Sequence, residues 1–137
     1  MILLDTNIIL DYAQIRENFF EHARKIFEKI DNKNLCGFIS ASSVTDIFYL
    51  LLKKMDTCEA KKKLVKLLRI LKVLPVDRQI IDIALDSSIN DFEDAVQVFA
   101  ARAMNISIVV TRDKTGFVDS GMTVFTPHEF LTYLESQ

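Results

Sequence analysis

The sequence predicts an α/β domain with a mostly parallel sheet flanked by helices. Short apolar runs rich in β-branched residues alternate along the chain with longer segments whose apolar residues recur at helical spacing. The first run, residues 2–4, is apolar without alternation, as strands covered on both faces are. Three glycines and two prolines leave no flexible linker, so residues 1–137 are expected to form a single domain.

The N-terminal elements follow directly from this pattern. Residues 2–4 read as a buried strand, and a short helix begins near Thr6. Residues 17–31 form a second helix with its aromatic and aliphatic side chains at helical spacing, and residues 35–39 form a second strand after a polar turn.

Two helices are predicted next. Ser42 or Ser43 would cap a helix that continues to about Lys54. This helix is apolar nearly all round, so it is expected to be deeply buried. Residues 57–71 form a basic amphipathic helix with leucines on its inner face.

The middle of the chain contains a weak strand, residues 72–74, which a proline ends, and a helix over residues 78–87. Asn90 is expected to cap the following helix, with Glu93 completing a capping box. That helix should end at about Met104.

The C-terminal part contains two predicted strands and one helix. Residues 107–111 are strongly β-branched, and a short strand lies near residues 123–125. The last helix has a clear start, with Thr126 as the cap, Pro127 as its first residue and Glu129 at the third position.

Composition excludes several classes of protein. No apolar run approaches the roughly 18 residues of a membrane span, and the N-terminus lacks the pattern of a secretory signal. A soluble cytoplasmic protein with no membrane partner is therefore expected. The two cysteines form no CxxC pair, and His22 and His128 are far apart in the sequence, which argues against a structural zinc site.

The net charge of −2 gives no overall attraction to nucleic acid, but the charges are unevenly placed. Residues 53–72 are strongly basic, and residues 77–94 are strongly acidic. A solvated helix face explains the lysines at least as well as a polyanionic partner does.

Four aspartates are expected at one edge of the sheet. Asp5 directly follows the first strand, and Asp113 follows the fourth. Asp46 lies one turn into the helix after the second strand, and Asp94 lies in the first turn of the helix that leads into the fourth. Ligand sites of parallel sheets lie beyond the carboxyl ends of the strands, so these side chains are candidate catalytic residues.

Converging carboxylates repel one another and call for a counter-ion. With no cysteine or histidine in these segments, the donor set favours Mg²⁺ or Mn²⁺. Such ions activate water and stabilise the leaving oxygen in phosphodiester hydrolysis, while a neighbouring carboxylate takes the proton.

Each acidic residue also has a purely structural explanation. Asp5 could cap the first helix, and Asp46 could form a capping box with Ser43. Asp91 is well explained as a helix-terminal residue, and Asp113 as a turn residue. Only the positions taken together favour a site.

Three short motifs in order, Leu3-Leu-Asp-Thr-Asn7, Asp91-Phe-Glu-Asp-Ala95 and Val109-Val-Thr-Arg-Asp113, resemble the PIN domain, most closely the small VapC toxins. The resemblance spans essentially the whole chain. It implies a three-layer, Rossmann-like sheet of about five strands and an Mg²⁺- or Mn²⁺-dependent ribonuclease.

The resemblance also implies roles for individual residues. Asp5, Asp94 and Asp113 correspond to the family's first, third and fourth acidic residues, which bind metal. The second is commonly Glu, and its best match is the shorter Asp46, which is expected to act through a water. The polar residues expected to orient these ligands are Thr6, Asn7, Asp91 and Thr111.

A ribonuclease toxin is the first interpretation. It implies an RNA substrate held through Arg112, Lys114 and the lysines of residues 53–72, an antitoxin protein and a homodimer. The alternatives are a binding module with little catalysis and a housekeeping RNA-processing nuclease. A phosphotransfer domain fits poorly, because Asn7 stands where a phosphatase of that kind needs a second aspartate.

Overall fold

A computed structural model describes all residues, 1–137, and confirms the predicted α/β class. Five strands form one sheet in the order β3-β2-β1-β4-β5, and every neighbouring pair is parallel. The strands are β1 (Ile2–Leu4), β2 (Gly37–Ser40), β3 (Lys72–Leu74), β4 (Ile108–Val110) and β5 (Thr123–Phe125). The helices are α1 (Thr6–Ala13), α2 (Phe20–Asp31), α3 (Ala41–Leu51), α4 (Thr57–Ile70), α5 (Arg78–Asp86), α6 (Phe92–Ala103), α7 (Pro127–Glu135) and a short 3₁₀ turn, η1 (Lys114–Phe117).

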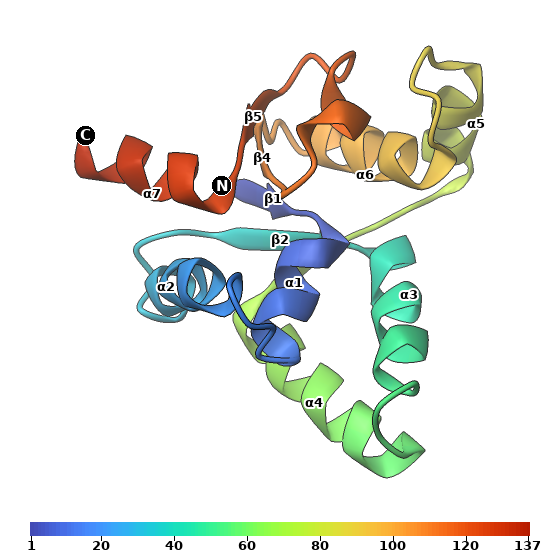
Figure 1. Cartoon of the computed structure of the whole chain (residues 1–137). Helices are drawn as coiled ribbons and strands as arrows, with labels where there is room; N and C mark the ends of the chain where they lie inside the picture. Colours follow the sequence, from blue (N-terminus) through green and yellow to red (C-terminus); the bar gives the residue numbers. More distant parts are fainter.

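The central strand β1 separates two apolar cores. Ile2 and Leu4 point into one core, and Leu3 points into the other, because successive side chains of a strand face opposite sides of the sheet. Helices α1, α2 and α4 cover the first face, and α5 and α6 cover the second (Figure 1). This sandwich explains why β1 is apolar without alternation.

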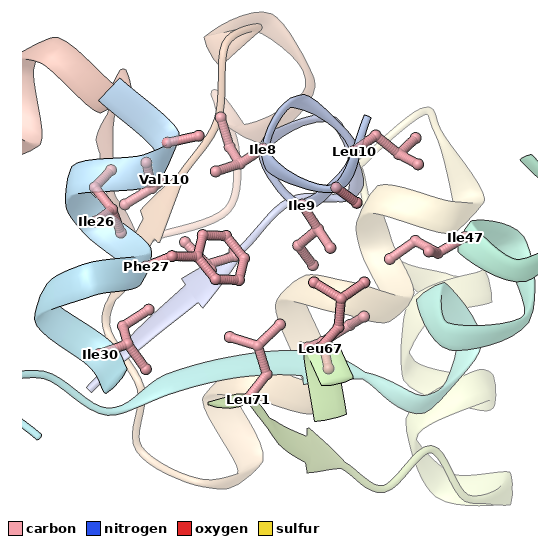
Figure 2. Packing of buried hydrophobic residues seen from close by; sticks show 14 of the residues in the cluster. Ile8, Ile9, Leu10, Ile26, Phe27, Ile30, Ile47, Leu67, Leu71 and Val110 are labelled. Carbon is pink, nitrogen blue, oxygen red and sulfur yellow. The ribbon is translucent and has the colours of Figure 1, made fainter. Parts of the chain in front are cut away.

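The larger core fixes the start of α1. Ile8, Ile9 and Leu10 of α1 are almost completely buried against side chains of α2, α3 and α4 (Figure 2). Phe27 of α2 stacks on Tyr12, with ring centroids 4.1 Å apart. Removing one buried aliphatic side chain here would cost about 2–5 kcal/mol, so the junction of β1 and α1 is rigidly held.

Two predicted helix caps are wrong. Ser40, at the end of β2, caps α3 by accepting a hydrogen bond from the backbone N–H of Ser43 at 3.3 Å, so neither Ser42 nor Ser43 is the cap. Asp91 rather than Asn90 caps α6, accepting from the N–H of Asp94 at 2.9 Å. In both cases the chain offers several residues close together that can cap, and the residue that does so has an extended backbone conformation.

The predicted burial of α3 is also wrong. Only Ser43, Ile47 and Leu51 are buried on this helix, and Tyr49 is 67% exposed. The helix packs along one side of the domain, against α1, α4 and α6, so Val44, Phe48 and Leu50 are only partly buried against the larger core. Helix α2 begins at Phe20, and Phe19 lies outside it and is exposed.

The remaining predicted elements are confirmed to within a few residues, and β1, β3 and β5 match fully. The capping box at Thr126 and Glu129 is present, with Pro127 as the first residue of α7. None of the helices has the length and apolar character needed to cross a membrane.

Candidate functional site

Asp5 lies at the carboxyl end of β1 and is the most heavily hydrogen-bonded carboxylate of the site. Its side chain is buried and accepts from the N–H of Thr6 at 2.7 Å, Thr111 Oγ1 at 2.8 Å, Gln97 Nε2 at 3.2 Å and Asn7 Nδ2 at 3.3 Å. The bond to Thr6 makes Asp5 the cap of α1. Asp5 therefore caps the helix and also stands at the centre of the predicted site.

Gln97 was not predicted as a site residue. It is fully buried on α6, and its Oε1 has no hydrogen-bond partner; Thr6 Oγ1 is a second buried oxygen without one. The available signal in the sequence was a polar residue inside an otherwise apolar helix face between Ala95 and Ala101. Two orphaned buried oxygens beside a carboxylate mark a place where a further donor is expected.

Asp94 is half-buried beside Asp5 and has a strongly raised pKa. Burial raises the pKa of its carboxyl group to about 7, assisted by the charges of Asp5, Asp91, Glu93 and Asp113. A side chain at Gly116 would overlap Asp94 Oδ2, so the glycine lets η1 close over this carboxyl group. The predicted mutual repulsion of the carboxylates is therefore present at Asp94.

Asp46 lies next to Glu93, a residue predicted only as a capping partner. Burial raises the pKa of Glu93 to about 6, with further contributions from the charge and hydrogen bonding of Asp46 and the charges of Asp91 and Asp5. Because Ser40 caps α3, Asp46 lies beyond the first turn and forms no capping box with Ser43. Asp46, one of the four predicted aspartates, is thus paired with Glu93.

Asp113 is exposed and makes the turn that the structural interpretation predicted. Its Oδ1 accepts from Thr115 Oγ1 at 2.6 Å and from the N–H of Thr115 at 3.1 Å, and these bonds lower the pKa of Asp113. Thr111 Oγ1, which donates to Asp5, also accepts from the N–H of Asp113 at 3.1 Å. The charge of Asp113 acts on Asp94, so it belongs to the same acidic group.

The two basic residues predicted to bind substrate are both paired. Arg112 donates from Nε and Nη2 to the buried Asp11 at 2.7 and 3.2 Å. Lys114 Nζ contacts Glu129 at 2.9 Å on the exposed start of α7. Asp11, which the sequence did not single out, is thus a structural anchor for Arg112.

The donor set of the acidic group consists of carboxylates, an amide and hydroxyls. This chemistry fits Mg²⁺ or Mn²⁺, which bind oxygen ligands, and the raised pKa of Asp94 and the unpaired Gln97 Oε1 are compatible with a cation at this place. No three or more His, Cys, Asp or Glu side chains are placed so that they could together hold a metal ion. Magnesium does not require such a cage, since it commonly takes one or two carboxylates and completes its shell with water and phosphate.

A family model described as the PIN domain matches residues 1–115. The solved structure of FitAB bound to an IR36 DNA fragment aligns over 93% of this chain and 95% of that one, with 21% identity and a TM-score of 0.72. VapC20 of Mycobacterium tuberculosis, described as a sarcin-ricin loop cleaving toxin, aligns over 87% and 95%, with 14% identity and a TM-score of 0.71.

A toxin–antitoxin complex from Klebsiella pneumoniae aligns over 94% of this chain and 99% of that one, with 18% identity and a TM-score of 0.68. At these identities the structural likeness concerns the fold. A search of curated sequences finds no significant match.

Proposed function

Because the chain belongs to the PIN domain family, we propose that it is a metal-dependent endoribonuclease and the toxin of a toxin–antitoxin pair. The observation that carries the proposal is the acidic group around Asp5. There Asp94 has a pKa of about 7 because it is buried among other carboxylates. A fold that maintains such repulsion favours a bound cation.

We assign Asp5, Asp94 and Asp113 as ligands of Mg²⁺ or Mn²⁺. The ion would supply an activated water and stabilise charge on the leaving oxygen of a phosphodiester. Asp5 is well suited to be the fixed ligand, since four hydrogen bonds set its orientation. The Asp5 carboxylate is oriented by hydrogen bonds from Thr6, Asn7 and Thr111. Asp91 accepts a hydrogen bond from the N–H of Asp94.

The pair Asp46 and Glu93 is assigned to proton transfer. The pKa of Glu93, raised to about 6, lies near the value that suits a general base at neutral pH. Asp46 has a shorter side chain than the glutamate common in the family, and Glu93 supplies a longer one at the same place. We propose that Glu93, hydrogen-bonded to Asp46, accepts the proton of the attacking water.

The partners follow from the same interpretation. Arg112, Lys114 and the lysines of α4 would meet the RNA backbone. A pocket of about 350 Å³ between α1, α2 and α4, lined by Tyr12, Ala13, Ile15, Phe20, Leu67 and Ile70 and rimmed by Lys63 and Lys66, is the proposed surface for an antitoxin segment. Complexes of toxins with antitoxins among the similar structures support this assignment, and we propose a homodimer of the chain itself.

Phe20 lines this pocket, whereas Phe48 packs against the larger core and Phe19 lies exposed under Arg112. Of these three phenylalanines, only Phe20 lines the groove. An apolar antitoxin segment with acidic flanks would match this pocket.

The deciding experiment measures cleavage of a varied set of RNAs with Mn²⁺, Mg²⁺ or EDTA. Asp5→Asn should abolish metal-dependent cleavage while RNA binding in EDTA persists; Asp86→Asn, an exposed aspartate at the end of α5, is the matched control. Wild type that binds RNA but never cuts it would establish the binding module instead. Growth arrest on expression, relieved by an antitoxin, would distinguish a toxin from a housekeeping nuclease.

A further inference from the structure

The fold brings together the only two histidines of the chain, which come from opposite ends of the sequence. The rings of His22 and His128 have their centroids 5.3 Å apart and are tilted by 47°. His22 lies in the first turn of α2 and His128 in the first turn of α7, and these two helices pack side by side. Because the two histidines are far apart in the sequence, their proximity becomes visible only in the fold.

The histidines line a pocket of about 380 Å³ that contains no carboxylate. Its lining residues are Asn18, Phe19, His22, Arg112, Thr126, Pro127 and His128. Two histidines, an arginine, an asparagine and a threonine thus line one cavity. A pocket lined by this many hydrogen-bond donors, and by no acid, suits an anion.

Charges next to the pocket leave it positive. Asp11 is buried and is shared by two arginines, since Arg16 Nη1 lies 3.5 Å and Arg112 Nε 2.7 Å from its carboxylate. Glu21 and Glu129, which adjoin the histidines in the sequence, are already paired with Arg24 and Lys114. Glu17, which precedes Asn18, is exposed and does not line the pocket. Asp11 therefore neutralises only one of the two guanidinium charges.

Arg112 is held so that it faces this pocket. Its guanidinium lies over the ring of Phe19, 4.0 Å from the centroid, while Nε and Nη2 are bound by Asp11. Its Nη1 makes no hydrogen bond within the protein. The start of α2 has no capping side chain either, so unpaired backbone N–H groups add to the positive character of this end.

The pocket adjoins the acidic site through a single residue. The backbone N–H of Arg112 donates to Asn7 Oδ1 at 3.4 Å, and Asn7 Nδ2 donates to Asp5 Oδ2 at 3.3 Å. Thr111 and Asp113, on either side of Arg112, belong to the acidic group. A strand of RNA cut at Asp5 would therefore pass beside the His22–His128 pocket.

We propose that this pocket binds a phosphate group, namely a backbone phosphodiester of the RNA strand adjacent to the bond that is cut. The assignment rests on the proposed ribonuclease function. A free phosphate ion or a nucleotide carries the same phosphate chemistry as the RNA backbone, so the tests must distinguish these sources.

The first test observes the histidine ring signals by NMR, with EDTA present so that no cleavage occurs. Because the chain has two histidines, both belonging to the pocket, each signal can be assigned with one variant, His22→Gln or His128→Gln. Inorganic phosphate should shift both signals with the same saturation curve, and chloride at equal ionic strength should not. Unmoved signals, or equal effects of chloride, would overturn the phosphate site whether or not the protein cuts RNA.

The second test measures binding of a single-stranded oligonucleotide in EDTA over a range of salt concentrations. His128→Gln, at an exposed helix position, should weaken binding about 3- to 10-fold and reduce the slope of log K against log salt by up to about 0.7. Lys33→Gln, an exposed cation beyond the opposite end of α2, is the charge control. Phosphate binding with unchanged RNA affinity in both histidine variants would assign the pocket to free phosphate and overturn the RNA assignment. Cleavage by the wild-type protein is measured in a separate experiment. A failure of the ribonuclease proposal can therefore be distinguished from a failure of the phosphate site.

Discussion

Gln97 and Asp5 form a buried pair in which only one end of the amide is used. Gln97 Nε2 donates to Asp5 Oδ1 at 3.2 Å, while Gln97 Oε1 has no partner. The orientation of the amide is fixed by the carboxylate, because the reversed amide would place two oxygens against each other. The fold therefore tolerates an orphaned oxygen in order to hold Asp5.

Replacing Gln97 tests this relationship. Gln97→Glu would place a second acid in a fully buried position beside Asp5, so its pKa in the folded state would lie above the ordinary value of about 4.3. Stability relative to wild type should fall as the pH rises from about 5 to 8, by on the order of 3 kcal/mol. Gln97→Met, of similar size and without charge, should show a loss independent of pH. Denaturant unfolding at both pH values checks this, and equal losses for Glu at pH 5 and 8 would contradict it.

Asp94→Asn should stabilise the metal-free protein. The folded pKa of Asp94 is raised from 3.8 to about 7, so the unfolded state loses the proton first and stability declines as pH rises between these values. At pH 8 in EDTA the variant should gain on the order of 1 kcal/mol, after allowance for the solvent screening of this half-exposed group. The stabilisation that Mg²⁺ gives wild type should disappear. A lower melting temperature in EDTA would instead indicate a packing role.

Arg112→Gln should be strongly destabilising, because it removes the closer of two partners from the buried Asp11. The expected cost is about 3 kcal/mol. Asp11→Asn combined with Arg112→Gln should cost clearly less than the two single changes together, by about 1–3 kcal/mol. Arg24→Gln, which breaks an exposed ion pair with Glu21 and Glu28, is the control and should cost under about 1 kcal/mol. Additive single effects would show that the pair is not coupled.

The corrected cap of α6 gives a direct comparison. Asp91→Ala should cost about 1 kcal/mol, whereas Asn90→Ala should change stability by less than about 0.5 kcal/mol. Measurement at pH 5 keeps Asp94 largely protonated, so that relief of its repulsion with Asp91 does not offset the lost cap. A larger effect at Asn90 would restore the interpretation drawn from the sequence.

The start of α7 should be sensitive to acid. Hydrogen bonds from the N–H of Thr126 and from Lys114 lower the pKa of Glu129 from 4.5 to about 2. Because the pKa of Glu129 is lower in the folded than in the unfolded protein, its ionised form stabilises the fold at pH values above 4.5. This contribution is lost as the pH falls toward 2. Glu129→Gln should therefore melt below wild type at pH 7, with the two converging near pH 2. Glu135→Gln, at the exposed end of the same helix, should follow wild type throughout.

The sequence was sufficient for most elements because their ends carry local signals. Asp5 ends β1, Pro75 follows β3, and Thr126 caps α7, and each of these acts within a few residues. Caps were misplaced where two candidates adjoin, as at Asn90 and Asp91. There the choice depends on where the preceding chain leaves its extended conformation.

Much of the candidate site could be predicted because parallel strands deliver their C-terminal residues to one edge. Asp5 and Asp94 were found in this way. Asp11 and Gln97 could not be predicted, because the role of a buried polar residue depends on its partner in the fold. The partner of Asp11 is Arg112, which lies 101 positions away in the sequence. The proximity of His22 to His128 has the same cause.

The position of β1 in the sheet has a consequence for synthesis of the chain. β1 lies between β2 and β4, and Asp5 meets Thr111, 106 residues later, through this arrangement. While the ribosome is still making the segment before β4, one edge of β1 has no neighbour and the carboxylate of Asp5 lacks Thr111, one of the four donors that orient it. A chain that ends before Asp113 therefore lacks part of the acidic group, and we expect it to lack the proposed nuclease activity.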